Sequence, residues 1–114
     1  MMLVRSGEAG CCVVILAAGE GTRMGSSRAK VLHELCGRPM IHYSVEAAQS
    51  LQPDRILVVI GHEAEKVRES LSDFSVECVL QSTRLGTGHA VMQAMDALTD
   101  WEGDILVFYG DTPL

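Results

Sequence analysis

The amino-acid sequence predicts an α/β fold in which a mainly parallel sheet carries helices on both faces. Two observations support this prediction. Four short apolar runs alternate with three segments of helical periodicity, which gives the order β, α, β, α, β, α, β. The residues that follow three of these runs are rich in glycine and polar side chains. In a parallel sheet such residues meet at one edge, where ligands bind.

The four predicted strands are residues 12–16, 55–60, 76–80 and 104–108. Each run is short, rich in valine, isoleucine and leucine, and closely followed by a turn or a polar residue. Nearly continuous apolar runs of this length are typical of parallel strands that are buried on both faces.

Three segments between the strands have apolar residues at helical spacing. The first follows Pro39, which suits the first turn of a helix, and the others follow Gly61 and Gly88. We expect the apolar positions to face the sheet. They are Ile41, Val45 and Ala48, then Ala64, Val67 and Leu71, then Val91, Met95 and Leu98.

Composition and charge narrow the classes of partner. The chain has 114 residues, 47% of them apolar and 21% charged, as in an ordinary globular domain. Its formal net charge of -6 argues against nucleic acid or an anionic membrane as a partner, so any bound anion must be held locally. No apolar run approaches the roughly 20 residues needed to span a bilayer. The four cysteines lack zinc or C-x-x-C spacing, which fits reduced thiols in a cytoplasmic protein.

The segment "LAAGEGTRM" after the first strand suits phosphate binding. Gly19 and Gly21 permit positive φ and remove side chains, so that successive backbone N–H groups can face one anion. Arg23 and Lys30 would add full positive charges. The segment is neither a Walker A motif nor a dinucleotide fingerprint, because Met24 stands at the third glycine position. A tight turn with solvated cations is the structural alternative.

The ends of the third and fourth strands carry further candidates. "LQSTRLGTGHA" offers Gln81, whose amide can pair with a pyrimidine edge, and Thr87, which can cap a helix. "FYGDTPL" offers Asp111, a plausible Mg²⁺ ligand beside substrate phosphates. Taken singly, each is better explained without a ligand, as a solvated glutamine, a simple helix cap and an aspartate that caps a turn. Their meeting at one sheet edge favours a shared site.

These motifs resemble those of a known enzyme family. "LAAGEGTRMGSSRAKVLHELCGRPM" is similar to the opening signature of the sugar-nucleotide pyrophosphorylases. With "VLQSTRLGTGHAV" and "FYGDTPL", the resemblance narrows to the uridylyltransferase domain of the bifunctional N-acetylglucosamine-1-phosphate uridylyltransferases and glucosamine-1-phosphate acetyltransferases. It implies a Rossmann-like nucleotidyltransferase fold, here truncated. Residues 11–114 would be its N-terminal, nucleotide-binding half, after a flexible lead-in at residues 1–10.

The resemblance also implies an activity. The family forms UDP-N-acetylglucosamine and pyrophosphate from UTP and N-acetylglucosamine 1-phosphate, with Mg²⁺. The product serves cell-wall biogenesis through peptidoglycan and lipopolysaccharide, and the enzyme is cytoplasmic. Neither nucleic acid nor membrane is implied as a partner. The sequence leaves the oligomeric state open, including a homo-oligomer.

By matching position, the resemblance assigns roles to individual residues. Arg23 and Lys30 would bind phosphates and act in catalysis, and Asp111 would bind Mg²⁺. No side chain needs to act as nucleophile or general base, because the attacking phosphate is already ionised, so the four histidines are expected to be structural or solvated. The substrate-binding set would be Leu16, Ala17, Ala18, Gly19, Gly21, Lys30, Gln81, Gly86, Thr87, Tyr109, Gly110 and Asp111.

The chain departs from the family pattern at two points. Ala29 stands where the family usually has a proline before the phosphate-binding lysine. The family's catalytic domain also continues well past the position of Leu114, with the sugar-binding residues and a second metal ligand, and an acetyltransferase domain usually follows. We therefore expect an incomplete site. A nucleotide-binding module without catalysis and another sugar or alditol nucleotidyltransferase remain alternatives.

Overall fold

The computed structural model describes residues 2–4, 10–19, 30–81 and 87–110. Within these ranges, a five-stranded sheet has the order β1-β7-β2-β5-β6, and a separate hairpin pairs β3 with β4. The strands are β1 (Met2–Val4), β2 (Cys11–Ala17), β3 (Glu34–Leu35), β4 (Arg38–Pro39), β5 (Arg55–Ile60), β6 (Glu77–Leu80) and β7 (Asp104–Tyr109). The helices are η2, a 3₁₀ turn (Lys30–Leu32), α1 (Met40–Gln49), α2 (Ala64–Ser70) and α3 (Thr87–Ala97).

The four predicted strands form the parallel part of the sheet. The central strand β2 pairs in parallel with β5 on one side and β7 on the other, and β5 pairs in parallel with β6. Side chains of β2 alternate between two buried clusters, with Val13 and Ile15 on one face and Cys12 and Val14 on the other. Because both faces are covered, the strand carries an almost unbroken apolar run.

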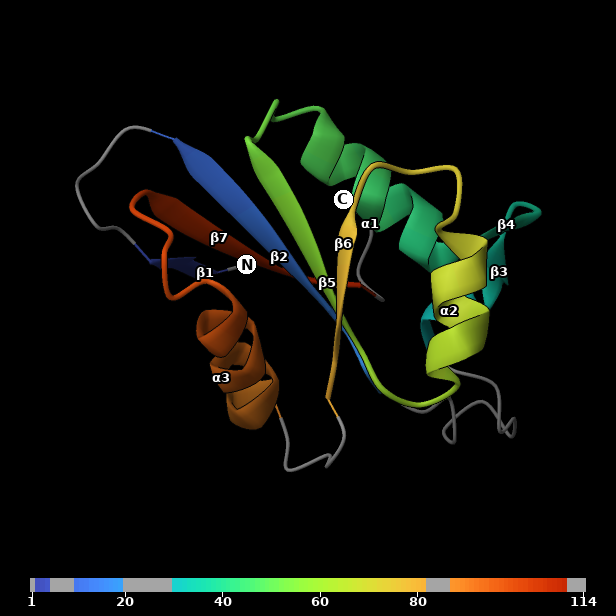
Figure 1. The fold of residues 1–114 in the computed structure, drawn as a ribbon. Coiled ribbons are helices and arrows are strands. Elements are labelled where there is room, and N and C mark those ends of the chain that lie inside the picture. Colours follow the sequence, from blue (N-terminus) through green and yellow to red (C-terminus); the bar gives the residue numbers. More distant parts are fainter. Residues whose placement is uncertain (1, 5–9, 20–29, 82–86, 111–114) are drawn as a thin grey trace.

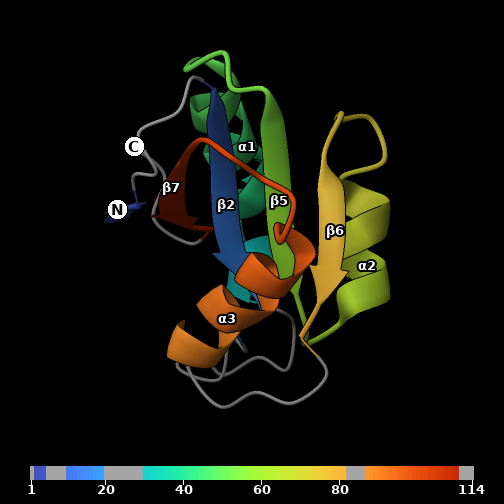
Figure 2. The same cartoon turned by 60° about the vertical axis from the view of Figure 1, so that its left-hand side comes forward.

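Helices lie on both faces of the sheet, which confirms the predicted fold class. Figures 1 and 2 show α1 and α2 on one face and α3 on the other. Ile41, Val45 and Val67 pack into the first cluster, and Leu98 packs into the second. No helix in the described ranges is both long and apolar enough to cross a membrane.

The buried face of α3 differs from the prediction. Of the three positions expected to face the sheet, Leu98 is buried and Val91 is partly buried against the second cluster, but Met95 is 37% exposed. Ala90 and Ala94, which were not predicted, are the other buried residues of the helix. Small side chains at these two positions let the helix backbone lie close to the sheet.

A short strand near the N-terminus was not anticipated by the sequence patterns. β1, within the segment expected to be a flexible lead-in, pairs antiparallel with β7, where Leu3 lies opposite Leu106. The strand covers part of the edge of β7 that β2 leaves open. Pairing of this kind satisfies backbone groups at a sheet edge.

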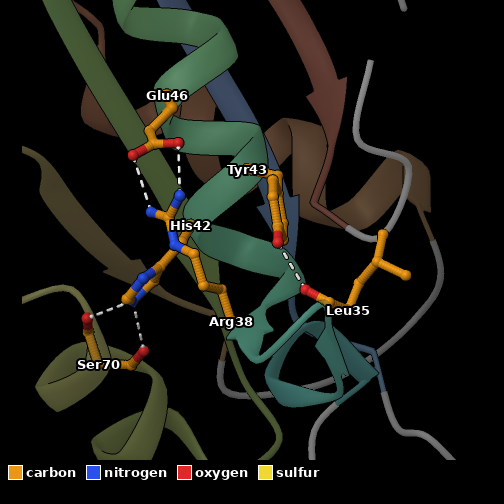
Figure 3. Close-up of polar contacts among 6 residues, drawn as sticks. All are labelled: Leu35, Arg38, His42, Tyr43, Glu46 and Ser70. Atoms are coloured by element: carbon orange, nitrogen blue, oxygen red, sulfur yellow. Dashed lines mark hydrogen bonds and ion pairs between the residues drawn. The ribbon is translucent and has the colours of Figure 1, made fainter.

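The β3–β4 hairpin is fastened to α1 by polar contacts (Figure 3). The Arg38 guanidinium makes two hydrogen bonds to the Glu46 carboxylate, at 2.8 and 3.0 Å. The Tyr43 hydroxyl donates to the Leu35 carbonyl. On the same helix, His42 Nε2 lies 2.9 Å from the Ser70 carbonyl at the end of α2. These contacts join the hairpin to α1 and α1 to α2.

The four cysteines are free thiols, as the sequence predicts. Burial raises the pKa of the Cys12 thiol to about 11, and it also raises the pKa of Cys78. Both thiols therefore stay protonated at neutral pH. Cys12 is fully buried in the cluster beneath α3, so its role is packing.

A polar cluster lies at the edge of the sheet formed by the amino ends of β5 and β6. The Arg55 guanidinium bonds both carboxylate oxygens of Glu77 across the β5–β6 pair, at 2.8 and 2.9 Å. It also lies 5.9 Å from the Trp101 ring centroid, within range of a cation–π contact. The Arg55 contact lowers the pKa of Glu77 below its usual 4.5.

Replacing Ile15 with alanine tests the core. The side chain is fully buried in the central strand, so Ile15→Ala is expected to lower the free energy of unfolding by about 3 kcal/mol. Urea denaturation followed by circular dichroism measures the change. Met92→Ala is the control, because Met92 is 64% exposed on α3 and its removal should shift stability by less than about 0.5 kcal/mol. Equal midpoints for the two variants would contradict the packing described above.

Replacing Glu77 with glutamine tests the ion pair through pH. Because the folded-state pKa of Glu77 is lowered, its stabilisation is complete at neutral pH and is lost as the pH falls below about 4.5. Since the carboxylate is half exposed, Glu77→Gln should cost only about 0.5 kcal/mol at neutral pH. The difference from wild type should vanish near pH 3. Glu69→Gln, which removes an exposed carboxylate on α2, is the control, and a Glu77→Gln difference independent of pH would exclude the ion pair as its source.

Candidate functional site

The carboxyl ends of the parallel strands meet at one edge of the sheet, as the sequence predicts. Backbone hydrogen bonds continue the sheet pairing past the strand ends. The Gly110 N–H donates to the Leu16 carbonyl at 2.8 Å, and the Gln81 N–H donates to the Ile60 carbonyl at 2.7 Å. The His62 N–H reaches the Ala18 carbonyl at 3.2 Å. The loops that leave β2, β5, β6 and β7 are therefore joined where they begin.

The described ranges contain part of the predicted site. Leu16, Ala17, Ala18, Gly19, Gln81, Tyr109 and Gly110 all lie at this edge. Lys30 is the first residue of η2 and Thr87 the first residue of α3. Gly21, Arg23, Gly86 and Asp111 lie outside the described residues, so their roles stay predictions.

Gly110 sits where the chain has no room for a side chain. A Cβ atom there would lie 3.0 Å from Val31 Cγ1, 3.1 Å from the Leu16 carbonyl oxygen and 3.3 Å from the Ala17 Cβ. The carbonyl of Gly110 accepts a 2.8 Å hydrogen bond from the hydroxyl of Ser44, a buried residue of α1. Gly110 is thus held between β2, η2 and α1, immediately before Asp111.

A second glycine, Gly61, allows a similar approach after β5. A Cβ atom there would lie 3.0 Å from the Ala18 Cβ and 3.3 Å from the carbonyl oxygens of both Ala18 and Gln81. The sequence analysis treated Gly61 only as the start of a helical segment. The sequence did contain a signal for this close approach, because Gly61 directly follows the buried strand β5.

Gly19 behaves differently from the expectation that its freedom is used for positive φ. Among the described glycines, positive φ occurs at Gly10 and Gly37 and not at Gly19. A Cβ atom at Gly19 would meet none of the described residues within 4 Å, and the residue is exposed. The described part of the fold therefore places no steric demand for glycine at this position. An open backbone of this kind leaves space for another molecule to approach.

Gln81 is buried, although a glutamine at a strand end is usually solvated. It is only 4% exposed, and its side-chain nitrogen lies 2.9 Å from Nδ1 of His89, in the first turn of α3. The expectation that His89 is structural agrees with this contact. The contacts of the Ser44 hydroxyl with Gly110 and of the His89 imidazole with Gln81 were not predicted from the sequence.

The described residues of this edge supply backbone amides and one buried carboxamide rather than an acid–base pair. No group of three histidine, cysteine or acidic side chains that could hold a metal ion occurs in the described part of the chain. A hollow of about 450 Å³ lies instead at the opposite edge, lined in part by Gln52, Asp54, Arg55 and Glu77. Its arginine is already bonded to Glu77, so that hollow is poorly suited to an anion.

The comparisons with known proteins agree with this geometry. Residues 13–114 match the family model of the MobA-like NTP transferase domain. A curated relative, the bifunctional protein GlmU of Thermus thermophilus, is 54% identical over 101 residues, which are 89% of this chain and 22% of the relative. The chain thus spans about a fifth of that relative's length. The resemblance drawn from the three motifs is confirmed.

Two solved structures share the fold. A nucleotidyl transferase from Methanothermobacter thermautotroptrophicus is 29% identical with a TM-score of 0.73, covering 93% of this chain and 52% of its own. The UDP-glucose pyrophosphorylase from Acinetobacter baumanii is 25% identical with a TM-score of 0.75, covering 90% of this chain and 46% of its own. Because the family model matches nearly the whole length of this chain, residues 13–114, the chain belongs to the MobA-like NTP transferase domain family.

Proposed function

We propose that this chain is the nucleotide-binding half of an Mg²⁺-dependent uridylyltransferase. The complete reaction would join UTP and N-acetylglucosamine 1-phosphate to form UDP-N-acetylglucosamine and pyrophosphate, in the cytoplasm. The convergence of the β2, β6 and β7 ends at one edge of the sheet carries this proposal most directly, because the three sequence motifs follow those strands.

The nucleoside would lie along the backbone that leaves β2. Leu16, Ala17 and Ala18 are fixed there by the sheet, and the open Gly19 lets a ligand approach the main chain closely. Gln81 stands across this edge with its amide buried, so its hydrogen bonds would be made without competition from water. A uracil edge offers both donors and acceptors to such an amide.

The phosphates would be held by Arg23 and Lys30, and Asp111 would supply a carboxylate to Mg²⁺. Mg²⁺ is commonly bound by one or two carboxylates together with substrate phosphates, so a site with few protein ligands fits the metal. Gly110, the residue before Asp111 in the sequence, is held beside the end of β2 by hydrogen bonds to Ser44 and Leu16. When bound, Mg²⁺ would neutralise charge on the triphosphate.

The chemistry would depend on positioning and charge neutralisation. A phosphate oxygen of N-acetylglucosamine 1-phosphate must approach the α-phosphorus of UTP while pyrophosphate departs. Both reactants are anions, so they repel each other. At an effective dielectric constant near 20, one cation about 4 Å from a phosphate charge is worth roughly 4 kcal/mol. Arg23 and Lys30 would supply this interaction, and the backbone N–H groups would orient the nucleotide.

Titration of UTP into the purified chain by calorimetry tests the proposal. We expect UTP to bind more tightly than CTP or GTP, and Mg²⁺ to strengthen the binding. Because water competes for part of the charge interaction, Arg23→Ala should weaken UTP binding by at least about tenfold. The control is Arg68→Ala, which removes an arginine paired with Glu65 on α2. A folded chain that binds no UTP would refute the proposal, and tighter binding of CTP or GTP would favour another nucleotidyltransferase.

Whether the bound nucleotide reacts is measured separately, as pyrophosphate release in the presence of N-acetylglucosamine 1-phosphate. Binding of UTP without release would support the alternative of a nucleotide-binding module that has no catalytic activity.

Replacing Ser44 with alanine tests how Gly110 is held. The change removes a buried hydrogen bond to the Gly110 carbonyl, so it should lower the free energy of unfolding by about 1–2 kcal/mol. It should also reduce the enhancement of UTP binding by Mg²⁺, because Asp111 follows Gly110. Ser50→Ala is the control, since the Ser50 hydroxyl donates to Ala47 at the exposed end of the same helix. If Mg²⁺ strengthens UTP binding equally in Ser44→Ala and in the wild type, Ser44 does not influence the metal site.

A further inference from the structure

The contact between Gln81 and His89 joins a strand end to a helix across the candidate site. Gln81 directly follows β6, and His89 is the third residue of α3. The side-chain nitrogen of Gln81 lies 2.9 Å from His89 Nδ1. Ala90, next to His89, is buried in the cluster that α3 forms with the sheet, and Val79 of β6 packs against the same cluster. The backbones that carry both side chains are therefore fixed.

This contact defines the proton position on the imidazole. A carboxamide nitrogen can only donate, so Nδ1 must accept and the ring proton must lie on Nε2. The opposite arrangement would turn the amide by half a rotation, with its oxygen accepting from a protonated Nδ1. Each tautomer of His89 therefore corresponds to one orientation of the Gln81 amide.

The orientation of the amide decides which nucleobase it can pair with. With its nitrogen directed to His89, the other arm of the Gln81 amide is its oxygen, which can only accept hydrogen bonds and has two lone pairs to do so. Uracil carries an N–H donor at ring position 3, whereas cytosine carries an acceptor there. An acceptor from the protein therefore favours uracil and repels cytosine, and a reversed amide would have the opposite preference.

We propose that His89 is a positioning residue that holds the Gln81 carboxamide in one orientation and thereby selects uracil over cytosine. The inference rests on the proposed function, because it assumes that a pyrimidine nucleotide lies against Gln81. His89 itself need not touch the nucleotide. The first turn of α3, which is held against the sheet through the buried Ala90, would carry the selectivity.

The tautomer of His89 tests the contact in the absence of any nucleotide. Long-range ¹H–¹⁵N correlation spectra of the full chain distinguish the two neutral tautomers, and the His89 signals are assigned by their loss in His89→Asn. We expect the Nε2–H form at neutral pH, with the Nδ1 resonance shifted in Gln81→Leu because the hydrogen bond is lost. A proton on Nδ1, or a Gln81→Leu spectrum unchanged at His89, would overturn the proposal.

The ratio of UTP to CTP affinity tests the consequence. We expect His89→Leu to reduce this ratio by about tenfold, the value of one well-placed hydrogen bond, chiefly through weaker UTP binding. His89→Asn should keep most of the selectivity, because its side-chain oxygen can still accept from Gln81. His42→Leu is the matched control, since His42 bonds Ser70 between α1 and α2, and its ratio should be unchanged.

The outcomes separate this inference from the function on which it rests. Equal weakening of UTP and CTP in His89→Leu, with the ratio intact, would mean that His89 only supports the fold and would overturn the proposal. The same conclusion would follow if His89→Asn lost as much selectivity as His89→Leu. A wild-type chain that binds neither nucleotide would refute the proposed function and the selectivity step together, whereas the tautomer measurement would still judge the contact with Gln81 independently.

Discussion

The parallel pairing of β2 with β5 and β7 is the constraint on which the rest of this structure depends. Parallel strands bring all their carboxyl ends to one edge, and β2 lies at the centre with both faces buried. The pairing does not stop at the strand ends, because Gly110 and Gln81 continue it through their backbone N–H groups. The candidate site is therefore positioned first by backbone hydrogen bonds that the fold must satisfy in any case. The side chains at this edge would then determine which ligand is selected, because the backbone positions are already set by the sheet.

Much of this frame could be predicted from the sequence, because buried parallel strands leave a strong signal. Runs such as residues 55–60 are apolar on both faces, and the following glycines and polar residues mark where they end. Three features were beyond such patterns. β1 has three residues and the β3–β4 strands have two each, too few for any periodicity. On α3, the apolar pattern favoured Met95, which is 37% exposed, and missed the buried Ala90 and Ala94.

Only part of the candidate site could be predicted from the sequence. The sequence could predict that Leu16, Gln81 and Gly110 lie at one edge of the sheet, because parallel strands end there, whereas their roles come from the resemblance and stay predictions. Ser44 and His89 were not assigned a role at the site, since each is connected to it here by one hydrogen bond. The Ser44 hydroxyl contacts a carbonyl 66 residues further along the chain. A contact of that separation is visible only once the helices have been packed on the sheet, so single-sequence patterns carry no trace of it.

A net charge of -6 limits how this chain could attract an anionic ligand. The long-range field of such a chain repels a nucleotide triphosphate, so attraction must arise at contact distance. Arg38, Arg55, Lys66 and Arg68 are each within 4.0 Å of a carboxylate, which leaves them partly neutralised. Arg23, Arg28 and Lys30 follow β2 in the sequence and fall within eight residues of one another. If the chain binds a triphosphate, these residues and the backbone amides beside them are where its charge has to be met.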